Sequence, residues 1–363
     1  MAKPLFRACM LALVLLCTAI TPAAADEDLW DELLPIGEYY TLLDPEGGIL
    51  LETGRRIYVE DRYLTAQNRL YEVVEVDDVA RTARTKLVEE VELEVTPWAE
   101  LRRQLGLTAI AAADPTGEKG AIAIYHTHNA ESYLPTDGTD SIYGKGGIHQ
   151  VGSAFAKALQ ERSVKVYYSE NLHLPHDRGA YRRSRETVLE LMAEEPDALF
   201  DVHRDAAPRS AYALQLGDQW VTSIQFVVGR QNQNLGVNRK YAESLKKLAD
   251  DLYPGLVKGI FYGRGNYNQD LSPLSLLLEV GAHTNSRPAA ERGVALFAEV
   301  VDHYFYGPAS QPERGQGSAA RRTVVGIVVF TSAAAAVFYV INAGGFANAL
   351  ERLRGALRLR NRR

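Results

Sequence analysis

The amino-acid sequence predicts an α/β fold with a mainly parallel sheet and helices on both faces. A small β-rich domain is expected before this fold, and one transmembrane helix after it. Apolar strand-like runs alternate with amphipathic helical runs over residues 121–307, which is typical of a parallel sheet covered by helices. Short strand-like pieces separated by turn residues fill residues 48–95, and residues 323–350 hold no charged side chain.

The N-terminus has the features of a cleavable signal peptide spanning residues 1–25. Lys3 and Arg7 precede a short apolar run, and three alanines follow it just before Asp26. The apolar run is shorter than the roughly 20 residues that a spanning helix needs, which favours cleavage over an uncleaved anchor. Both cysteines of the chain lie in this segment, so the mature protein is expected to have neither disulfides nor thiol chemistry.

The C-terminal region is expected to anchor the protein in the cell membrane as a single-pass protein. After a linker at residues 308–322, residues 323–343 are long and apolar enough for a transmembrane helix, whereas a buried helix of a soluble domain rarely stays uncharged for so long. Two arginines precede this segment, and six follow it in a basic tail at residues 344–363. The positive-inside rule makes the tail cytoplasmic and the catalytic part extracytoplasmic.

Between these ends the chain divides into an accessory domain, a linker and a larger domain. The accessory domain, residues 26–95, is β-rich and has no catalytic spacing; wall binding, partner binding and simple packing all fit it. Residues 96–120 are expected to be a linker, and residues 121–307 the larger domain. Residues 26–320 hold 30 Lys and Arg against 45 Asp and Glu, a net charge of about −15 that argues against nucleic acid as a partner.

The larger domain is expected to alternate strands and helices, with its functional residues at the carboxyl ends of strands. Strands are predicted at 121–125, 164–168, 198–202, 221–228 and 274–280, and helices at 151–162, 181–194, 235–252 and 289–304.

Three of the predicted strands deliver ionisable side chains to one edge of the sheet. A charged group directly after a buried strand has a desolvation cost unless it is paired or bound to a metal. Two histidines and one carboxylate leave an open position for water in a catalytic zinc site, and a further carboxylate can act as a general base. The pattern therefore predicts a metal centre, and its candidate residues are His126, His128, Glu131, His203, Arg204, Asp205 and Glu279.

Other histidines are expected to lie outside this centre. His173 and His176 occupy a polar loop that is predicted to be solvated, with a second metal site as the alternative. His283 follows the last strand, where it either lines the cleft or packs.

Five segments of the larger domain follow one another in a recognisable order: IYHTHNAESYLP (124–135), VG with AKAL (151–159), SRET (184–187), DVHRD (201–205) and LEVG with a following Asn (278–285). Together they resemble the stage II sporulation protein P family, over about residues 120–306. This family is related to the zinc N-acetylmuramoyl-L-alanine amidases. The resemblance therefore implies a zinc amidase-like fold that cleaves the amide between N-acetylmuramic acid and the stem peptide; some members also cleave peptide cross-links.

The resemblance also implies a set of zinc ligands. His128 and His203 match the two zinc-binding histidines. Glu131 is the expected third ligand, because the first helix lacks the glutamate that related amidases carry there. His149 is the alternative third ligand in place of Glu131, and His126 is the second alternative.

Catalytic roles follow from the same match. Glu279 corresponds to the catalytic glutamate, which would help to deprotonate the attacking water. Arg204 and Asp205 are expected to orient His203 or a substrate carboxylate. If His203 is not a ligand, it is expected to assist proton transfer to the leaving amine.

Two other functions fit the sequence less well. A catalytically silent peptidoglycan-binding or division scaffold has no use for an open metal site, and a cross-link endopeptidase would release different products. The expected partners are peptidoglycan, the membrane through the single C-terminal helix, and other cell-wall or division proteins. Familiar family members carry an N-terminal anchor and act in spore formation, so a role in sporulation is not implied for this chain.

Overall fold

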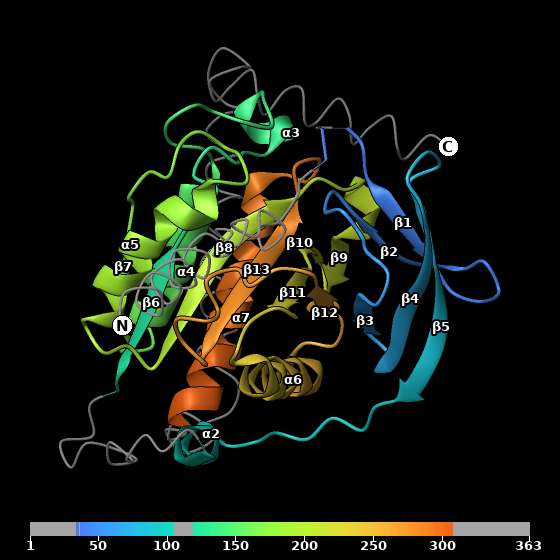
Figure 1. The fold of residues 1–363 in the computed structure, drawn as a ribbon. Coiled ribbons are helices and arrows are strands. Elements are labelled where there is room, and N and C mark those ends of the chain that lie inside the picture. The colour runs from blue at the N-terminus through green and yellow to red at the C-terminus, as the bar shows by residue number, and fades with distance from the viewer. Residues whose placement is uncertain (1–33, 36, 105–118, 308–363) are drawn as a thin grey trace, which may run out of the picture. The chain divides into compact units, whose positions relative to one another are not determined.

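In the computed structural model, which describes residues 34–35, 37–104 and 119–307, eleven strands form one mixed sheet (Figure 1). Its strand order is β2-β1-β5-β4-β3-β12-β11-β13-β8-β6-β7, and β9 and β10 form a separate hairpin. The strands are β1 (Tyr40–Leu43), β2 (Ile49–Thr53), β3 (Arg62–Thr65), β4 (Arg69–Asp77), β5 (Thr82–Glu90), β6 (Ala121–Tyr125), β7 (Lys165–Tyr168), β8 (Ala198–Asp205), β9 (Ala213–Leu216), β10 (Gln219–Thr222), β11 (Ile224–Gly229), β12 (Val257–Gly263) and β13 (Ser275–Ala282). The helices are α2 (Trp98–Gln104), α3 (Leu134–Asp137), α4 (Ile148–Gln160), α5 (Ala180–Met192), α6 (Leu235–Leu252), α7 (Arg287–Tyr306) and the 3-10 turn η2 (Arg209–Ala211).

The prediction of a mainly parallel sheet is wrong, because the sheet changes direction at its centre. β7, β6, β8 and β13 run parallel to one another, but β13 pairs antiparallel with β11. A parallel neighbour requires a crossover that returns the chain to its starting side, usually a helix. The connection from β12 to β13 contains no helix in the described chain, so β13 runs opposite to β11 and β12.

The N-terminal strands continue the same sheet and do not form a separate β-rich layer before it. β3 pairs antiparallel with β12, joining Leu64 to Ile260, and β4 and β5 follow it outward. The strand β12, on which this junction depends, was not predicted from the sequence. Local patterns cannot reveal such a pairing, because the two strands lie nearly 200 residues apart in the chain.

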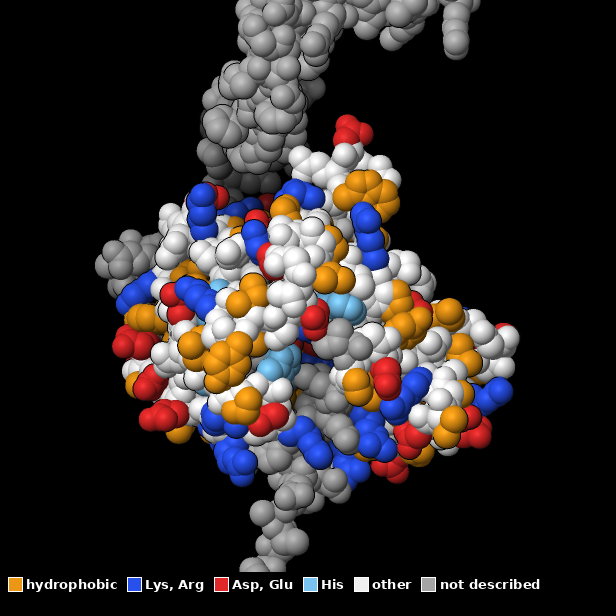
Figure 2. Space-filling model, turned by 90° about the horizontal axis from the view of Figure 1, so that it is seen from above, with side chains coloured by type: hydrophobic (Ala, Val, Ile, Leu, Met, Phe, Trp, Pro, Cys, Tyr) orange, Lys and Arg blue, Asp and Glu red, His pale blue; other side chains and the backbone are white. Residues whose placement is uncertain are grey.

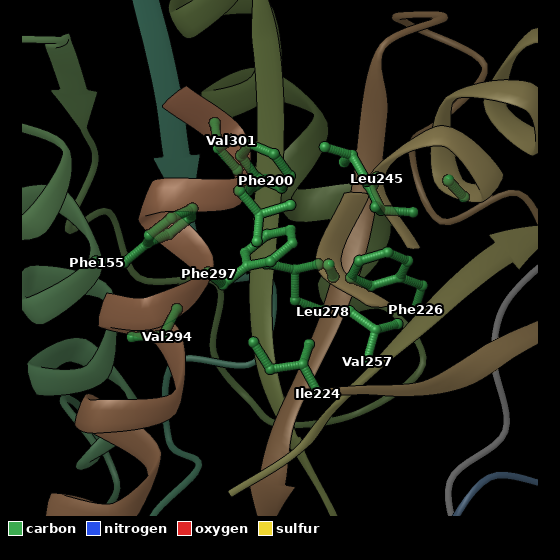
Figure 3. Packing of buried hydrophobic residues seen from close by; sticks show 14 of the residues in the cluster. Phe155, Phe200, Ile224, Phe226, Leu245, Val257, Leu278, Val294, Phe297 and Val301 are labelled. Atoms are coloured by element: carbon green, nitrogen blue, oxygen red, sulfur yellow. The ribbon is translucent and has the colours of Figure 1, made fainter. Parts of the chain in front are cut away.

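One face of the central strands is covered by α4, α6 and α7, and the core lies between them (Figures 1 and 3). Phe297 of α7 occupies its centre. The centroid of its ring lies 5.9 Å from those of Phe155 and Phe200, and 5.4 Å from that of Phe226. Such aromatic contacts add to the stability gained by burying the rings.

The opposite face is covered differently, which also corrects the expectation of helices on both faces. Among the described helices, α5 packs against this face, where Val188 shares a buried cluster with Ala123 of β6. The face of β11, β12 and β13 is covered instead by the N-terminal strands, whose Leu42 shares a cluster with Val227 and Leu277.

The expectation of a single-pass membrane protein is also corrected. None of the helices within residues 37–104 and 119–307 has both the length and the apolar character needed to cross a membrane. Even α7, with 20 residues, carries charged side chains such as Glu291 and Arg292. The segments predicted as signal peptide (1–25), transmembrane helix (323–343) and cytoplasmic tail (344–363) lie outside the described residues.

Candidate active site

Three neighbouring parallel strands bring the candidate residues to one end of the sheet. Asp201 of β8 is in register with Tyr125, the last residue of β6, and His203 is in register with Glu279 of β13. His128 follows β6 by three residues. Figure 2 views the molecule from this end and shows histidine side chains at the surface among charged ones.

Three imidazoles surround one carboxylate oxygen. The Oε1 atom of Glu131 lies 3.4 Å from Nδ1 of His128, 3.5 Å from Nδ1 of His203 and 3.9 Å from Nε2 of His176. Ligand atoms of Glu131, His128 and His176 all lie within 4.8 Å of one another. The other oxygen of Glu131 accepts a hydrogen bond from the backbone N–H of Arg204 at 2.9 Å, which fixes the carboxylate.

The chemistry of this cluster suits a metal ion. Within the described chain, the three imidazole nitrogens that face Glu131 are buried and make no hydrogen bond. Burial lowers the pKa of His128 to about 4 and that of His176 to about 3, so both rings are neutral, the form that binds metals. Zinc takes histidine nitrogens and carboxylate oxygens, and a catalytic site uses three of them. The residues therefore fit a zinc ion.

His203 is tied to a second carboxylate. Its Nε2 atom lies 2.9 Å from Oδ1 of Asp201, while its Nδ1 atom faces Glu131. Burial lowers the pKa of His203, but the charges of Asp201 and Glu131 together outweigh burial and raise the pKa to about 10. A cation beside Glu131 would oppose the charge on this ring and favour loss of its proton.

The two alternative ligands lie apart from this cluster and contact each other. The rings of His126 and His149 are 4.7 Å apart. Both nitrogens of His126 are occupied, by the carbonyl of Val202 at 2.7 Å and the hydroxyl of Tyr168 at 3.0 Å. His149 Nε2 lies 3.5 Å from the side-chain nitrogen of Asn129.

Glu279 contributes a second carboxylate beside the cluster. It lines a cavity of about 610 Å³ together with Glu131, His176 and Arg204. Burial raises the pKa of Glu279 to about 7, although the nearby Arg55 opposes the rise. A carboxylate with a pKa near neutrality is suited to general acid–base catalysis.

Arg204 and Asp205 are largely engaged with the protein itself. The guanidinium of Arg204 donates to the carbonyls of Ser132 at 3.3 Å and Asp140 at 3.0 Å, so it braces the loop that carries Glu131. Asp205 accepts hydrogen bonds from the backbone of Gly54 and from the hydroxyl of Tyr212, each at 2.8 Å.

Comparison with known families shows where this sequence belongs. The model of the family described as stage II sporulation protein P matches residues 60–302, more than half of the chain. The chain belongs to this family. The resemblance seen in the sequence is thereby confirmed.

A curated relative supports the same membership. Stage II sporulation protein P of Bacillus subtilis (strain 168) is 32% identical over 232 residues, 57% of this chain and 58% of the relative. The chain thus spans less than two thirds of that relative's length.

Solved structures of amidases show weaker likenesses to this family member. An N-acetylmuramyl-L-alanine amidase from Mycobacterium smegmatis is 13% identical, with 53% of this chain and 99% of that chain covered and a TM-score of 0.34. The CwlD amidase from Clostridioides difficile, in complex with the GerS lipoprotein, is 12% identical, with coverages of 51% and 98% and a TM-score of 0.32. TM-scores in this range do not establish a common fold.

In this sporulation protein P family member, sequence reasoning gave no role to Asp201 or Arg55, and its expectation that His176 lies in a solvated loop outside the centre is wrong, because His176 faces Glu131. Asp201 had a usable signal, because residues two apart on a strand share a face, and His203 follows at that spacing. His176 lies in a polar loop with no local pattern that distinguishes it from a solvated histidine. Arg55 contacts Glu279 from 224 residues away, and no sequence signal joins them.

Proposed function

We propose that this protein is a zinc-dependent peptidoglycan hydrolase that cleaves the amide between N-acetylmuramic acid and the stem peptide. The proposal rests on the convergence of buried imidazole nitrogens from His128, His176 and His203 on one oxygen of Glu131. Membership of the stage II sporulation protein P family supports peptidoglycan as the substrate, since that family is related to the zinc amidases.

The proposed zinc ligands are His128, Glu131 and His203. Asp201 favours His203 as a ligand, because a carboxylate on one ring nitrogen orients the other toward a metal. His176 is the competing third ligand, since it faces the same oxygen of Glu131. When bound, zinc supplies a Lewis acid that polarises the amide carbonyl and lowers the pKa of water.

The chain's own residues would handle the proton. Oε2 of Glu279 accepts a proton from the attacking water, and the resulting carboxylic acid returns it to the leaving amine nitrogen. If His176 takes the third ligand position, His203 is free to donate to that amine instead. Arg204 acts by holding the segment of Glu131 in place.

Digestion of purified sacculi tests the proposal. The protein with zinc should release intact stem peptides, identified by mass spectrometry, and a chelator should stop the release until zinc is restored. Glu279→Gln serves as the control with strongly reduced activity. Products cut within the peptide cross-links would indicate an endopeptidase, and no product at all would refute hydrolysis.

A further inference from the structure

A buried arginine from the N-terminal strands reaches the proposed catalytic carboxylate. Arg55 follows β2, whereas Glu279 lies in β13. Nε of Arg55 donates to Oε1 of Glu279 at 3.1 Å, and a second guanidinium N–H donates to the same oxygen. The two side chains are 1% and 3% exposed, so solvent screens this ion pair little.

The two oxygens of Glu279 are therefore in different situations. The two hydrogen bonds that Arg55 donates to Glu279 both go to Oε1, whereas Oε2 is buried and has no hydrogen-bond partner in the described part of the chain. Glu279 and Glu131 line one cavity. A reactant bound there would meet a carboxylate whose Oε1 is already hydrogen-bonded to Arg55 and whose Oε2 is not.

The backbone around Arg55 is closely docked against the end of β8. The N–H of Gly54 donates to Oδ1 of Asp205 at 2.8 Å. A Cβ at Gly54 would lie 2.5 Å from the Cβ of Ala206, so only glycine permits this approach. The guanidinium of Arg55 also lies 5.2 Å from the ring centroid of Tyr267. These contacts hold the guanidinium in one place.

We propose that Arg55 is a positioning residue for the reaction: it binds Oε1 of Glu279 so that Oε2 alone faces the attacking water. This inference rests on the proposed function. Arg55 also lies before residue 60, where the family match begins, so the N-terminal strands complete a site whose other residues fall within the match. Removing this contact leaves the carboxylate free to rotate, which lowers the fraction of molecules with the productive geometry.

Kinetics of the zinc-loaded full chain on purified peptidoglycan test this role. Arg55→Met should lower kcat by about 10- to 100-fold, less than the loss of the base itself, with little change in KM. Arg55→Lys should recover part of kcat. An ammonium keeps the positive charge but lacks the planar guanidinium group that donates two N–H bonds to one oxygen. Zinc content should stay at the wild-type level. The matched control is Arg56→Met, because Arg56 is adjacent and pairs at 3.3 Å with the exposed Asp78.

A double-mutant cycle separates positioning from a structural role. In the Glu279→Gln background, adding Arg55→Met should change the residual kcat less than about twofold, because Arg55 acts through Glu279. The double variant also removes both charges of the pair together, so it provides a folded comparison if Arg55→Met alone is unstable. The same loss in both backgrounds, accompanied by a lower melting temperature, would overturn the inference.

Failure of the inference and failure of the proposed function give different results. If the wild type is active and Arg55→Met behaves like Arg56→Met, the inference alone is wrong. If the zinc-loaded wild type releases no product, the proposed function is wrong and the inference is overturned with it.

Discussion

Asp201 and His203 lie two residues apart on β8, with Oδ1 of the aspartate 2.9 Å from Nε2 of the histidine. Both side chains are buried. Asp201 also accepts hydrogen bonds from the backbone N–H and the hydroxyl of Thr127, at 2.8 and 2.6 Å. One carboxylate therefore orients His203 and ties β8 to the segment that carries His128.

Replacing this carboxylate should weaken metal binding. Asp201→Asn keeps the shape but removes the charge that orients His203, so zinc affinity should fall by about 10- to 100-fold. Competition with a zinc-binding dye measures the change. Asp251→Asn is the control, because Asp251 is exposed on α6 and pairs with Lys247 at 2.6 Å, away from the site. Equal zinc affinity in the two variants would rule out the orienting role.

Zinc content should distinguish the two candidates for the third ligand. We expect His203→Ala to lose both zinc and activity, and His176→Ala to retain its zinc, because only His203 is backed by a carboxylate on its other nitrogen. Elemental analysis of the purified variants measures this. The reverse result would assign the ligand position to His176 and leave His203 as the proton donor.

Glu279→Gln should separate chemistry from folding. The amide keeps the shape of the side chain but cannot accept the proton, so cleavage should fall by about 100- to 10,000-fold. Zinc content and the melting temperature should change little. Loss of zinc in this variant would instead make Glu279 a ligand and count against Glu131 in that position.

The pH dependence of cleavage should reflect the same carboxylate. Burial raises the pKa of Glu279 to about 7, and a base acts only when it is ionised. The value of kcat/KM should therefore be low at acidic pH and rise as the pH passes through about 7. Initial rates across a pH series measure this rise in kcat/KM. A rise that persists unchanged in the residual activity of Glu279→Gln would assign it to another group.

Truncating Phe297 should lower the stability of the folded core strongly. Phe297→Ala removes a ring that packs between α4, β8 and β11, and large-to-small changes of this kind cost about 3–5 kcal/mol. Denaturant unfolding measures the free energy. Tyr143→Ala, at a side chain that is 83% exposed, should stay within about 0.5 kcal/mol of the wild type.

Most strands and helices of the larger domain, β12 excepted, were predictable because their signals are local. β6 occupies residues 121–125 and α6 occupies residues 235–252, as their apolar periodicities indicated. The direction of β13 was not predictable. A continuous apolar run shows that a strand is buried on both faces, but it says nothing of which neighbour it pairs with or in which direction.

The sequence by itself determined the family and brought His128, Glu131, His203 and Glu279 forward as candidates, because each follows or ends an apolar strand. Only the tertiary structure decided that the N-terminal strands join the same sheet, that Arg55 reaches Glu279, and that the loop of His176 folds over Glu131. The physical reason is that strand ends are encoded by neighbouring residues. Contacts between distant segments depend instead on how the whole chain buries its apolar surface and pairs its buried charges.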